Sequence, residues 1–334
     1  MSELELLADD PEWADVTPIR QYENVNPIAP IFYSEEYKDA TDYFRAVVKS
    51  GETSPRVLKL TEKIIRMNPA HYTAWQHRYK TLIALQSDLE EELRLMDDIA
   101  KQFLKTYQVW HHRRLLLTAI NSVDVAQLEL EFLKDVLEVD TKNYHTWSYR
   151  QWILAHFNKE ARLWAGERPY VEALLDADVR NNSAWHHRFF VVFSSGVRLG
   201  DEDREQVLRR ELSFAKEKIA LAPNNPSAWN YLRGVLEFTK TPFETLASFV
   251  LPYTASKPPA PEDEVVDLDN PLPSQDAELP CVAALEFLAD VYEKRGGDET
   301  AKAVEIWKTL ANEKDVIRKK YWEYRIRDAL QSAN

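Results

Sequence analysis

The sequence predicts an all-α fold in which helical hairpins stack into an α-α superhelix. Three observations support this prediction. Only 7 of the 334 residues are glycine, which leaves little material for tight β-hairpins or glycine-rich phosphate loops. A tryptophan motif recurs at intervals of 35 to 44 residues, the length of two helices and their turns. Amphipathic stretches with helical spacing of apolar residues lie between its copies.

The motif occurs five times, as NPAHYTAWQHR, FLKTYQVWHHR, DTKNYHTWSYR, DVRNNSAWHHR and APNNPSAWNYL. Its tryptophans are Trp75, Trp110, Trp147, Trp185 and Trp229. A weaker sixth copy, WEYR, lies near the C-terminus. Residues that favour helix N-caps stand four positions before the tryptophan in four of the copies: Thr106, Asn143, Asn181 and Asn225. We therefore expect a helix to start just before each tryptophan.

A second helix is expected before each of four tryptophans, and together with its tryptophan helix it makes a hairpin. The amphipathic ranges are Pro55 to Met67, Asp88 to Phe103, Val125 to Val139 and Asp203 to Leu221. Helices are also expected at Cys281 to Arg295, Glu299 to Asn312 and Asp315 to Ala329. The predicted organisation is an N-terminal extension (1–54), helical-hairpin repeats (55–251), a loop (252–280) and C-terminal helices that complete the same superhelix (281–334).

The loop is predicted from its composition, because prolines are followed by seven acidic residues: Glu262, Asp263, Glu264, Asp267, Asp269, Asp276 and Glu278. Within the motif, the tryptophan and the arginine three residues later share one side of the helix. We interpret the tryptophans as seam fillers and the arginines as partners of buried carbonyls or acids. The fifth copy has Leu232 in the arginine position and Arg233 one step later, so we assign it a packing role.

Composition excludes several classes of function. The chain has 42 Lys and Arg against 55 Asp and Glu, a net charge of −13, which argues against general binding to nucleic acid. No apolar run approaches the roughly 18 to 20 residues of a membrane span. The single cysteine, Cys281, cannot form an internal disulfide, and the first residues lack the basic flank and apolar core of a signal peptide. We expect a cytoplasmic protein.

Few residues indicate a self-contained active site. All eight histidines lie near the tryptophan motif, and adjacent ones such as His111 and His112 diverge by about 100° on a helix, so no metal site is expected. The turn before a tryptophan helix is a better candidate, because exposed backbone N–H groups and the positive helix end attract anions. Lys105 and Lys142 each stand five residues before a tryptophan, in equivalent turns.

The repeats around these lysines resemble those of protein prenyltransferase α subunits. KTYQVWHHRR (105–114), KNYHTWSYRQW (142–152) and VRNNSAWHHRFF (179–190) carry the resemblance, together with EWADVTPI (12–19) and FYSEEYKDATDYFRAV (32–47). They are most like the α subunits shared by protein farnesyltransferase and geranylgeranyltransferase type I. The similarity covers most of residues 12 to 240.

The resemblance implies a crescent-shaped subunit of an obligate heterodimer, wrapped around a β subunit. In that family the β subunit holds the catalytic Zn²⁺, which activates the cysteine thiol of a C-terminal CaaX sequence, and Mg²⁺ assists the farnesyltransferase reaction. The thiolate attacks C1 of farnesyl or geranylgeranyl diphosphate. The implied partners are therefore a β subunit, an isoprenoid diphosphate and CaaX proteins.

The resemblance also assigns residues. Lys105 matches the lysine that contacts the isoprenoid diphosphate and would stabilise the leaving group in catalysis. Gln108 matches the glutamine that binds the CaaX carboxylate. The remaining substrate-binding candidates match tyrosines near peptide and diphosphate and the neighbouring edge: Tyr72, Tyr107, Asn143, Tyr144 and His145.

Two alternatives remain open from the sequence. One is the α subunit of Rab geranylgeranyltransferase, which shares the repeat. The other is a non-catalytic helical-repeat adaptor that docks peptides, as tetratricopeptide proteins do. An adaptor would be soluble and monomeric by itself, whereas an α subunit would depend on its partner.

Overall fold

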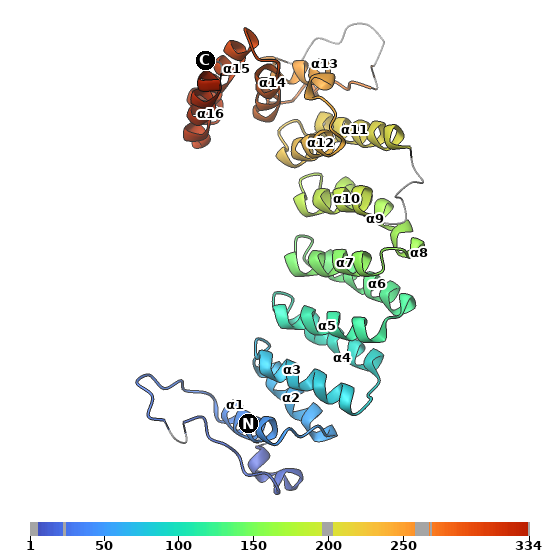
Figure 1. The fold of residues 1–334 in the computed structure, drawn as a ribbon, viewed down its shortest axis with the longest axis vertical. Coiled ribbons are helices and arrows are strands. Elements are labelled where there is room, and N and C mark those ends of the chain that lie inside the picture. The colour runs from blue at the N-terminus through green and yellow to red at the C-terminus, as the bar shows by residue number, and fades with distance from the viewer. Residues whose placement is uncertain (1–5, 23–24, 196–202, 258–266, 268, 333–334) are drawn as a thin grey trace. The chain divides into compact units, whose positions relative to one another are not determined.

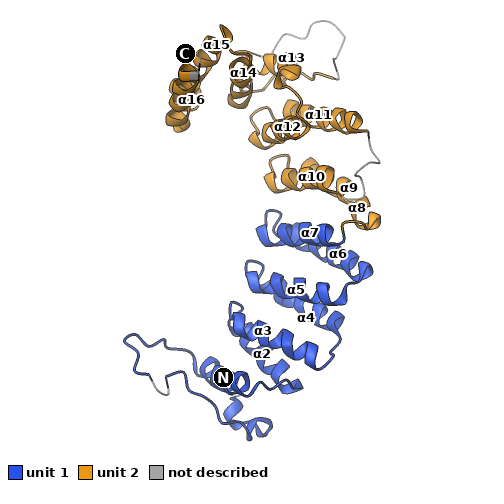
Figure 2. Ribbon diagram, in the orientation of Figure 1, with its two compact units in different colours: residues 1–157 blue, residues 158–334 orange. Residues whose placement is uncertain are grey.

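The computed structural model describes residues 6–22, 25–195, 203–257, 267 and 269–332, and within them it contains helices and connecting turns but no strand. The chain divides into two compact units, residues 1–157 and 158–334 (Figure 2). Each unit is built from paired helices that follow one another along the chain (Figure 1). The prediction of an all-α fold made of helical hairpins is confirmed.

Unit 1 contains helix α1 and three hairpins, α2/α3, α4/α5 and α6/α7. Within it, the tryptophan helices α3, α5 and α7 pack side by side, and α4 packs against α6. Two short 3-10 helices precede α1. The bounds are 3-10 helices Leu7–Asp9 and Pro11–Trp13, α1 Glu35–Ser50, α2 Pro55–Met67, α3 Tyr72–Ala84, α4 Leu89–Gln102, α5 Tyr107–Ile120, α6 Val123–Val139 and α7 Tyr144–His156.

Unit 2 continues with hairpins α9/α10 and α11/α12, followed by a set of short helices and by α14, α15 and α16. The bounds are α8 Ala161–Ala165, α9 Glu167–Ala177, α10 Asn182–Ser194, α11 Arg204–Leu221, α12 Pro226–Thr239, α13 Ala247–Val250, α14 Val282–Arg295, α15 Glu299–Thr309 and α16 Lys319–Ser332. Irregular helices occupy Phe243–Leu246, Leu251–Thr254, Leu310–Lys314 and Val316–Arg318.

The tryptophan helices start at the predicted caps. The side chains of Asn143, Asn181 and Asn225 accept hydrogen bonds from backbone N–H groups of the first turn, which satisfies donors that the helix leaves unpaired. Thr106 occupies the N-cap of α5, but its side chain makes no capping hydrogen bond. His71 caps α3 through Nδ1, a cap that the sequence analysis did not identify.

Buried ion pairs join successive repeats. In unit 1, Glu92 on α4 binds two partners. Arg78 of the preceding tryptophan helix donates from Nη2 to Glu92 Oε2 at 2.6 Å, and His112 Nε2 of the same hairpin lies 2.9 Å from Glu92 Oε1. Glu129 repeats this arrangement with Arg113 and Tyr149. We call each such acid with its two partners a glutamate clamp. The interpretation of the arginines as partners of buried acids is confirmed for these two.

Arginines of the tryptophan motif also bind carbonyl groups in the first helix of their own hairpin. Arg78 Nη1 donates to the Leu58 carbonyl oxygen at 2.7 Å, and Arg150 Nη1 donates to that of Leu130 at 2.8 Å. In unit 2, Arg188 and Tyr231 form a third clamp around Glu211, at 2.7 and 2.6 Å. The clamps set the register of each helix pair, because a buried acid must find its donors.

Part of the predicted loop, residues 258–266 and 268, lies outside the described residues. Its two described ends are attached to unit 2. Lys216 Nζ donates to the Asp269 carbonyl oxygen at 2.9 Å, and Tyr253 Oη donates to that of Pro271 at 2.8 Å. Asn224 Nδ2 donates to the Glu278 carbonyl oxygen at 2.8 Å. These hydrogen bonds return the chain to the repeats before α14.

Candidate functional site

Each tryptophan of the motif fixes the turn that precedes its helix. The indole Nε1 donates to the carbonyl oxygen six residues earlier, at 2.8 to 3.0 Å in all five copies. The acceptors are Pro69, Leu104, Thr141, Val179 and Pro223. All five tryptophans are buried, as a seam filler must be. Each therefore has a second role, because its hydrogen bond sets the conformation of a turn at the surface.

The turn that carries Lys105 is held by two side chains. The Leu104 carbonyl oxygen accepts from Trp110 Nε1 at 2.9 Å and from Asn143 Nδ2, in the next repeat, at 3.4 Å. Lys105 itself is exposed, and its ammonium has no hydrogen bond or ion pair with any residue that the structure describes. The turn thus presents an uncompensated cation from a fixed backbone.

Asn143 connects α7 to this turn. Its side chain is only 3% exposed. Oδ1 accepts from the Thr146 backbone N–H at 3.0 Å, and Nδ2 also donates to Asp140 Oδ2 at 3.2 Å. Both ends of the amide are engaged within the protein, so Asn143 is placed to position the Lys105 turn through its bond to Leu104.

Three tyrosines open the three tryptophan helices of unit 1. Tyr72, Tyr107 and Tyr144 are the first residues of α3, α5 and α7, and they are 72%, 68% and 70% exposed. Because these helices lie side by side, the tyrosines follow one edge of the unit. An exposed tyrosine offers both an aromatic ring and a hydroxyl group to a ligand.

His145 joins the last two of these tyrosines. Its ring packs edge-on against Tyr107, with centroids 4.3 Å apart, and against Tyr144 at 5.5 Å. Partial burial lowers the pKa of His145 below its ordinary value, so the imidazole is neutral at pH 7. Gln108, the second residue of α5, is half-buried and has no hydrogen bond to the described residues, which leaves its amide available to a ligand.

A groove of 220 Å³ runs between α5 and α7. It is lined by Tyr107, Trp110, His111, Arg114, Tyr144, His145, Ser148, Tyr149 and Trp152. It brings together three of the predicted residues, Tyr107, Tyr144 and His145, while Tyr72 belongs to the preceding repeat. Arg114 and Trp152 were not predicted from the sequence, although the spacing of Tyr107, His111 and Arg114 (i, i+4, i+7) puts them on one helix face.

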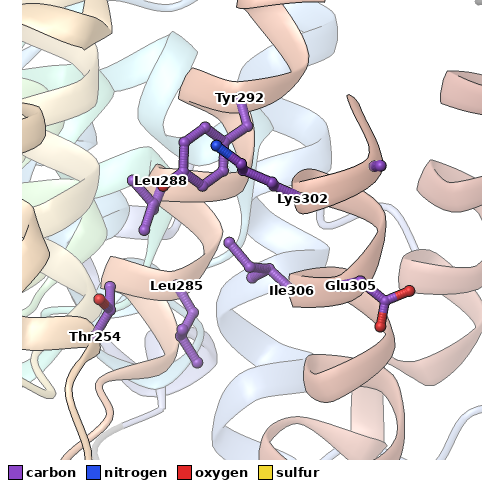
Figure 3. A pocket seen from close by; sticks show the side chains of 8 residues that line it. Thr254, Leu285, Leu288, Tyr292, Lys302, Glu305 and Ile306 are labelled. Atoms are coloured by element: carbon purple, nitrogen blue, oxygen red, sulfur yellow. The ribbon is translucent and has the colours of Figure 1, made fainter. Parts of the chain in front are cut away.

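A second cavity lies in unit 2, between α14 and α15 (Figure 3). Its volume is 470 Å³, and Leu285, Leu288 and Ile306 make it mostly apolar. Its lysine is already engaged, because Lys302 Nζ donates to Glu299 Oε1 at 2.7 Å and lies 5.4 Å from the centre of the Tyr292 ring. None of the predicted site residues contributes to it.

The described residues contain no group of three or more His, Cys, Asp or Glu side chains arranged to hold a metal ion. Two histidines of the tryptophan motif bind buried glutamates. His112 and His187 are buried against Glu92 and Glu167, at 2.9 and 2.7 Å. Among the described residues, no helix is both long and apolar enough to cross a membrane.

Comparison with known proteins identifies the repeat. A family model described as the protein prenyltransferase alpha subunit repeat matches residues 54–85, 89–120, 126–157, 164–195 and 208–239. The farnesyltransferase/geranylgeranyltransferase type-1 α subunit of Dictyostelium discoideum is 36% identical over 97% of this chain and 95% of its own length. That of Schizosaccharomyces pombe is 38% identical over 96% of both. The chain belongs to the protein prenyltransferase α-subunit family.

Prenyltransferase α subunits also supply a structural match. Candida albicans protein geranylgeranyltransferase-I complexed with GGPP contains a chain that superposes with a TM-score of 0.80 at 30% sequence identity, over 96% of this chain and 99% of that chain. A type-2 relative, the geranylgeranyl transferase α subunit of Mus musculus, is 30% identical over 60% of this chain and only 37% of its own length. The type-1 relatives therefore match both ends of this prenyltransferase α subunit, and the type-2 relative matches only part of it.

Proposed function

We propose that the chain is the α subunit of a heterodimeric CaaX protein prenyltransferase. The enzyme transfers farnesyl or geranylgeranyl from its diphosphate to the cysteine of a C-terminal CaaX sequence. The observation that carries the proposal is Lys105, an unpaired cation on a turn fixed by Trp110 and Asn143, next to the groove of Tyr107, Tyr144 and His145.

The prenyl-transfer reaction is favoured by a cation at this position. The thiolate sulfur forms a bond to C1 of the isoprenoid, the bond from C1 to oxygen breaks, and diphosphate leaves with the electron pair. Negative charge therefore grows on the diphosphate in the transition state, and a fixed ammonium group stabilises it. Lys105 binds there, while the hydroxyl groups of Tyr107 and Tyr144 donate hydrogen bonds to the same anion.

The other residues orient the substrates. Gln108 lies three residues after Lys105, at the start of α5, and its free amide donates to the carboxylate at the end of the CaaX peptide. The neutral His145 holds the Tyr107 ring, and Asn143 positions the Lys105 turn. Tyr72, one repeat earlier on the same edge, contacts the peptide.

The metal requirements are assigned to other components. The described residues contain no cluster of side chains that fits a zinc site. We therefore place the Zn²⁺ that activates the thiol on the β subunit. Mg²⁺ accompanies the diphosphate in the farnesyl reaction. The enzyme is cytoplasmic, as the sequence predicts.

Reconstitution tests this proposal. The chain, co-expressed with a β subunit of farnesyltransferase or geranylgeranyltransferase type I, is offered a CaaX peptide and each isoprenoid diphosphate. We expect prenylation of the peptide by the complex and none by either subunit alone. Offering a Rab protein with its escort separates the type-2 alternative, and turnover of the Rab substrate alone would contradict the proposal.

A second measurement addresses the adaptor alternative. An α subunit with a wide unpartnered face should express poorly by itself and be rescued by co-expression with β. The size distribution of the purified chain reports this directly. A monodisperse, stable chain that binds peptides without a partner would favour the adaptor.

A further inference from the structure

We propose that Arg114, backed by the ring of Trp152, is a docking point for a carboxylate side chain of the β subunit. The inference rests on the proposed function, because it takes the β subunit as the partner. It adds a specific contact, at the end of the groove away from Lys105, that the substrate-binding residues do not explain.

Arg114 is prepared for a ligand that the described chain does not supply. Its guanidinium lies 4.9 Å from the centre of the Trp152 ring. Trp152 is itself held in a stack between Tyr149, with centroids 5.7 Å apart, and His156, at 4.9 Å. Arg114 is exposed, and the structure gives it no hydrogen bond or ion pair with a described carboxylate. Its neighbour Arg113, in contrast, is buried and paired with Glu129.

The fifth repeat shows what an arginine at this position binds. Arg233 stands four residues after Trp229, as Arg114 stands four residues after Trp110. Its guanidinium also lies near aromatic rings, 5.3 Å from Phe287 and 5.6 Å from Phe243. There a later helix supplies the acid, because Arg233 forms an ion pair with Asp290 of α14. Arg114 has the ring but lacks the acid.

The planar guanidinium group pairs best with a carboxylate or phosphate, through two parallel hydrogen bonds. A partner protein is favoured over a free anion because the lining of the groove has the composition of an interface centre. Trp, Tyr and Arg dominate such centres, and here they are Trp152, Arg114, Tyr107, Tyr144 and Tyr149.

The position of the groove indicates which partner. Tyr107, Tyr144 and His145 line the groove and belong to the proposed substrate edge. A β subunit that completes the active site must cover this edge. Arg114 is seven residues further along α5 than Tyr107, a distance of about 10 Å at 1.5 Å per residue, so the same partner reaches it.

The test uses the complete heterodimer. We compare the wild type with Arg114→Ala, Arg114→Lys and Arg114→Glu, and measure the rate of β-subunit dissociation by exchange with labelled β subunit at two salt concentrations. Arg94, exposed on α4 of the same hairpin and unpaired within the described chain, gives the matched control Arg94→Ala. Melting of each complex and the kcat and KM for a CaaX peptide are recorded in parallel.

We expect dissociation to accelerate about 30-fold in Arg114→Ala and further in Arg114→Glu, because a desolvated carboxylate on β loses its partner. Arg114→Lys should lie between wild type and alanine, since lysine retains the charge but not the paired hydrogen bonds. Arg94→Ala should match the wild type. Reversal of one acidic residue of β to arginine should restore slow dissociation in Arg114→Glu.

Several results would overturn the inference. Unchanged dissociation in an active complex would remove Arg114 from the interface and leave the proposed function intact. A raised peptide KM with unchanged dissociation would make the groove a peptide site. If Arg94→Ala accelerated dissociation as much as Arg114→Ala, the effect of Arg114 would come from net charge and not from a specific contact. Failure of the wild-type chain to bind or activate any β subunit would instead refute the proposed function.

Discussion

The two units share the devices that build the repeat and differ in the residues at its surface. Both have tryptophans that donate to the carbonyl six residues earlier, and both have a glutamate clamp, around Glu129 in unit 1 and around Glu211 in unit 2. At the first position of the tryptophan helix, unit 1 has tyrosine three times, whereas unit 2 has Asn182 and Pro226. The shared contacts build the repeat, and the two units differ at the first turn of the tryptophan helices, where we propose the site.

The exposed faces of the tryptophan helices differ in the same way. Between α5 and α7 of unit 1 the groove combines aromatic rings with polar groups, and the Arg114 guanidinium lies over the Trp152 ring. On α10 and α12 of unit 2, the rings of Phe189, Phe193 and Phe238 form an apolar cluster, with centroids 4.6 to 5.6 Å apart. The same type of helix pair thus carries a groove with an exposed arginine in unit 1 and a cluster of phenylalanine rings in unit 2.

The largest expected effect concerns the clamps and should be equal in the two units. Glu129→Ala removes the buried acid shared by Arg113 and Tyr149 and leaves Arg113 only the partly exposed Asp97. Glu211→Ala likewise leaves Arg188 only the partly exposed Glu172 and removes the acceptor of Tyr231. Removing one partner of a buried pair costs about 3 to 5 kcal/mol. Thermal unfolding of the heterodimer measures the loss.

The exposed Glu138 gives a control on the same helix as Glu129. Glu138→Ala should change the free energy of unfolding by less than about 0.5 kcal/mol. A large loss in one clamp variant and none in the other would show that the repeats are not stabilised in the same way.

The next effect should separate the units. Lys105 and Arg180 occupy the same repeat position, five residues before a tryptophan, and both are exposed. Lys105→Ala should lower kcat about 10- to 1000-fold, equivalent to ~1.4 to 4 kcal/mol of transition-state stabilisation, with a smaller change in peptide affinity. Arg180→Ala should leave kcat unchanged. Single-turnover kinetics of the complex measures the chemical step.

Gln108→Ala complements this comparison within unit 1. Loss of a contact to the peptide carboxylate should raise the KM for the peptide and leave kcat nearly constant. An unchanged KM would argue against that contact, and an unchanged single-turnover rate in Lys105→Ala would exclude Lys105 from the mechanism.

Most of the fold could be predicted because the tryptophan motif and the amphipathic stretch before it recur along the sequence. The range Pro55 to Met67 matches α2, and Asn143, Asn181 and Asn225 cap their helices as expected. The first helix of the fourth repeat was not predicted. Gly166 divides it into α8 and α9, and Pro169 lies in the first turn of α9, so neither piece is long enough to show a clear helical period.

The site was less predictable than the fold. Lys105 could be singled out, since a cation before a helix N-terminus is visible in sequence, but the two side chains that fix its turn are not. The bond from Asn143 to Leu104 spans 39 residues and depends on how one hairpin packs on the next. The stack under Arg114 likewise requires Trp152 from another repeat.

A smaller effect should distinguish two asparagine caps that make the same kinds of hydrogen bond. Asn143 and Asn225 each cap a helix and each donate to a carbonyl of the preceding tryptophan turn, at Leu104 and Val179. Either change to alanine should cost about 1 kcal/mol of stability. Only Asn143→Ala should also lower kcat, about 3- to 30-fold, because Lys105 then moves relative to the diphosphate.

The two measurements on these caps separate positioning from stability. Equal melting temperatures with unequal kcat values would support the role of Asn143 in placing Lys105. Equal kcat values in Asn143→Ala and Asn225→Ala would instead show that both asparagines act as helix caps without a role in placing Lys105.

The last effect is a loss of stability at acidic pH, and it contrasts the clamps around Glu92 and Glu211. His112 in unit 1 is buried, and burial lowers its pKa despite the hydrogen bond to Glu92 and the field of that carboxylate, while Arg78 and His111 lower it further. Tyr231 takes the equivalent place beside Glu211 in unit 2, where burial raises its pKa well above 10. Below neutral pH, therefore, protonation of a histidine affects the Glu92 clamp, whereas Tyr231 stays neutral in the Glu211 clamp.

The sign follows from the proton balance. Below the ordinary histidine pKa of 6.5 the unfolded chain binds a proton that folded His112 does not, so the free energy of unfolding falls as the pH falls. Burial alone would raise the pKa of Glu92, but hydrogen bonds from His112 and Arg78 hold it below 4.5, so the glutamate contributes only at lower pH.

His112→Tyr converts this clamp to the form found around Glu129 and Glu211 and should keep the bond to Glu92. Between pH 6.5 and 5.5 we expect the variant to lose up to about 1.4 kcal/mol less stability than the wild type, the value of one proton per pH unit. Unfolding of the complex across this range measures the difference. Parallel curves for the two proteins would mean that His112 is protonated in the folded state without cost, and would contradict the burial argument.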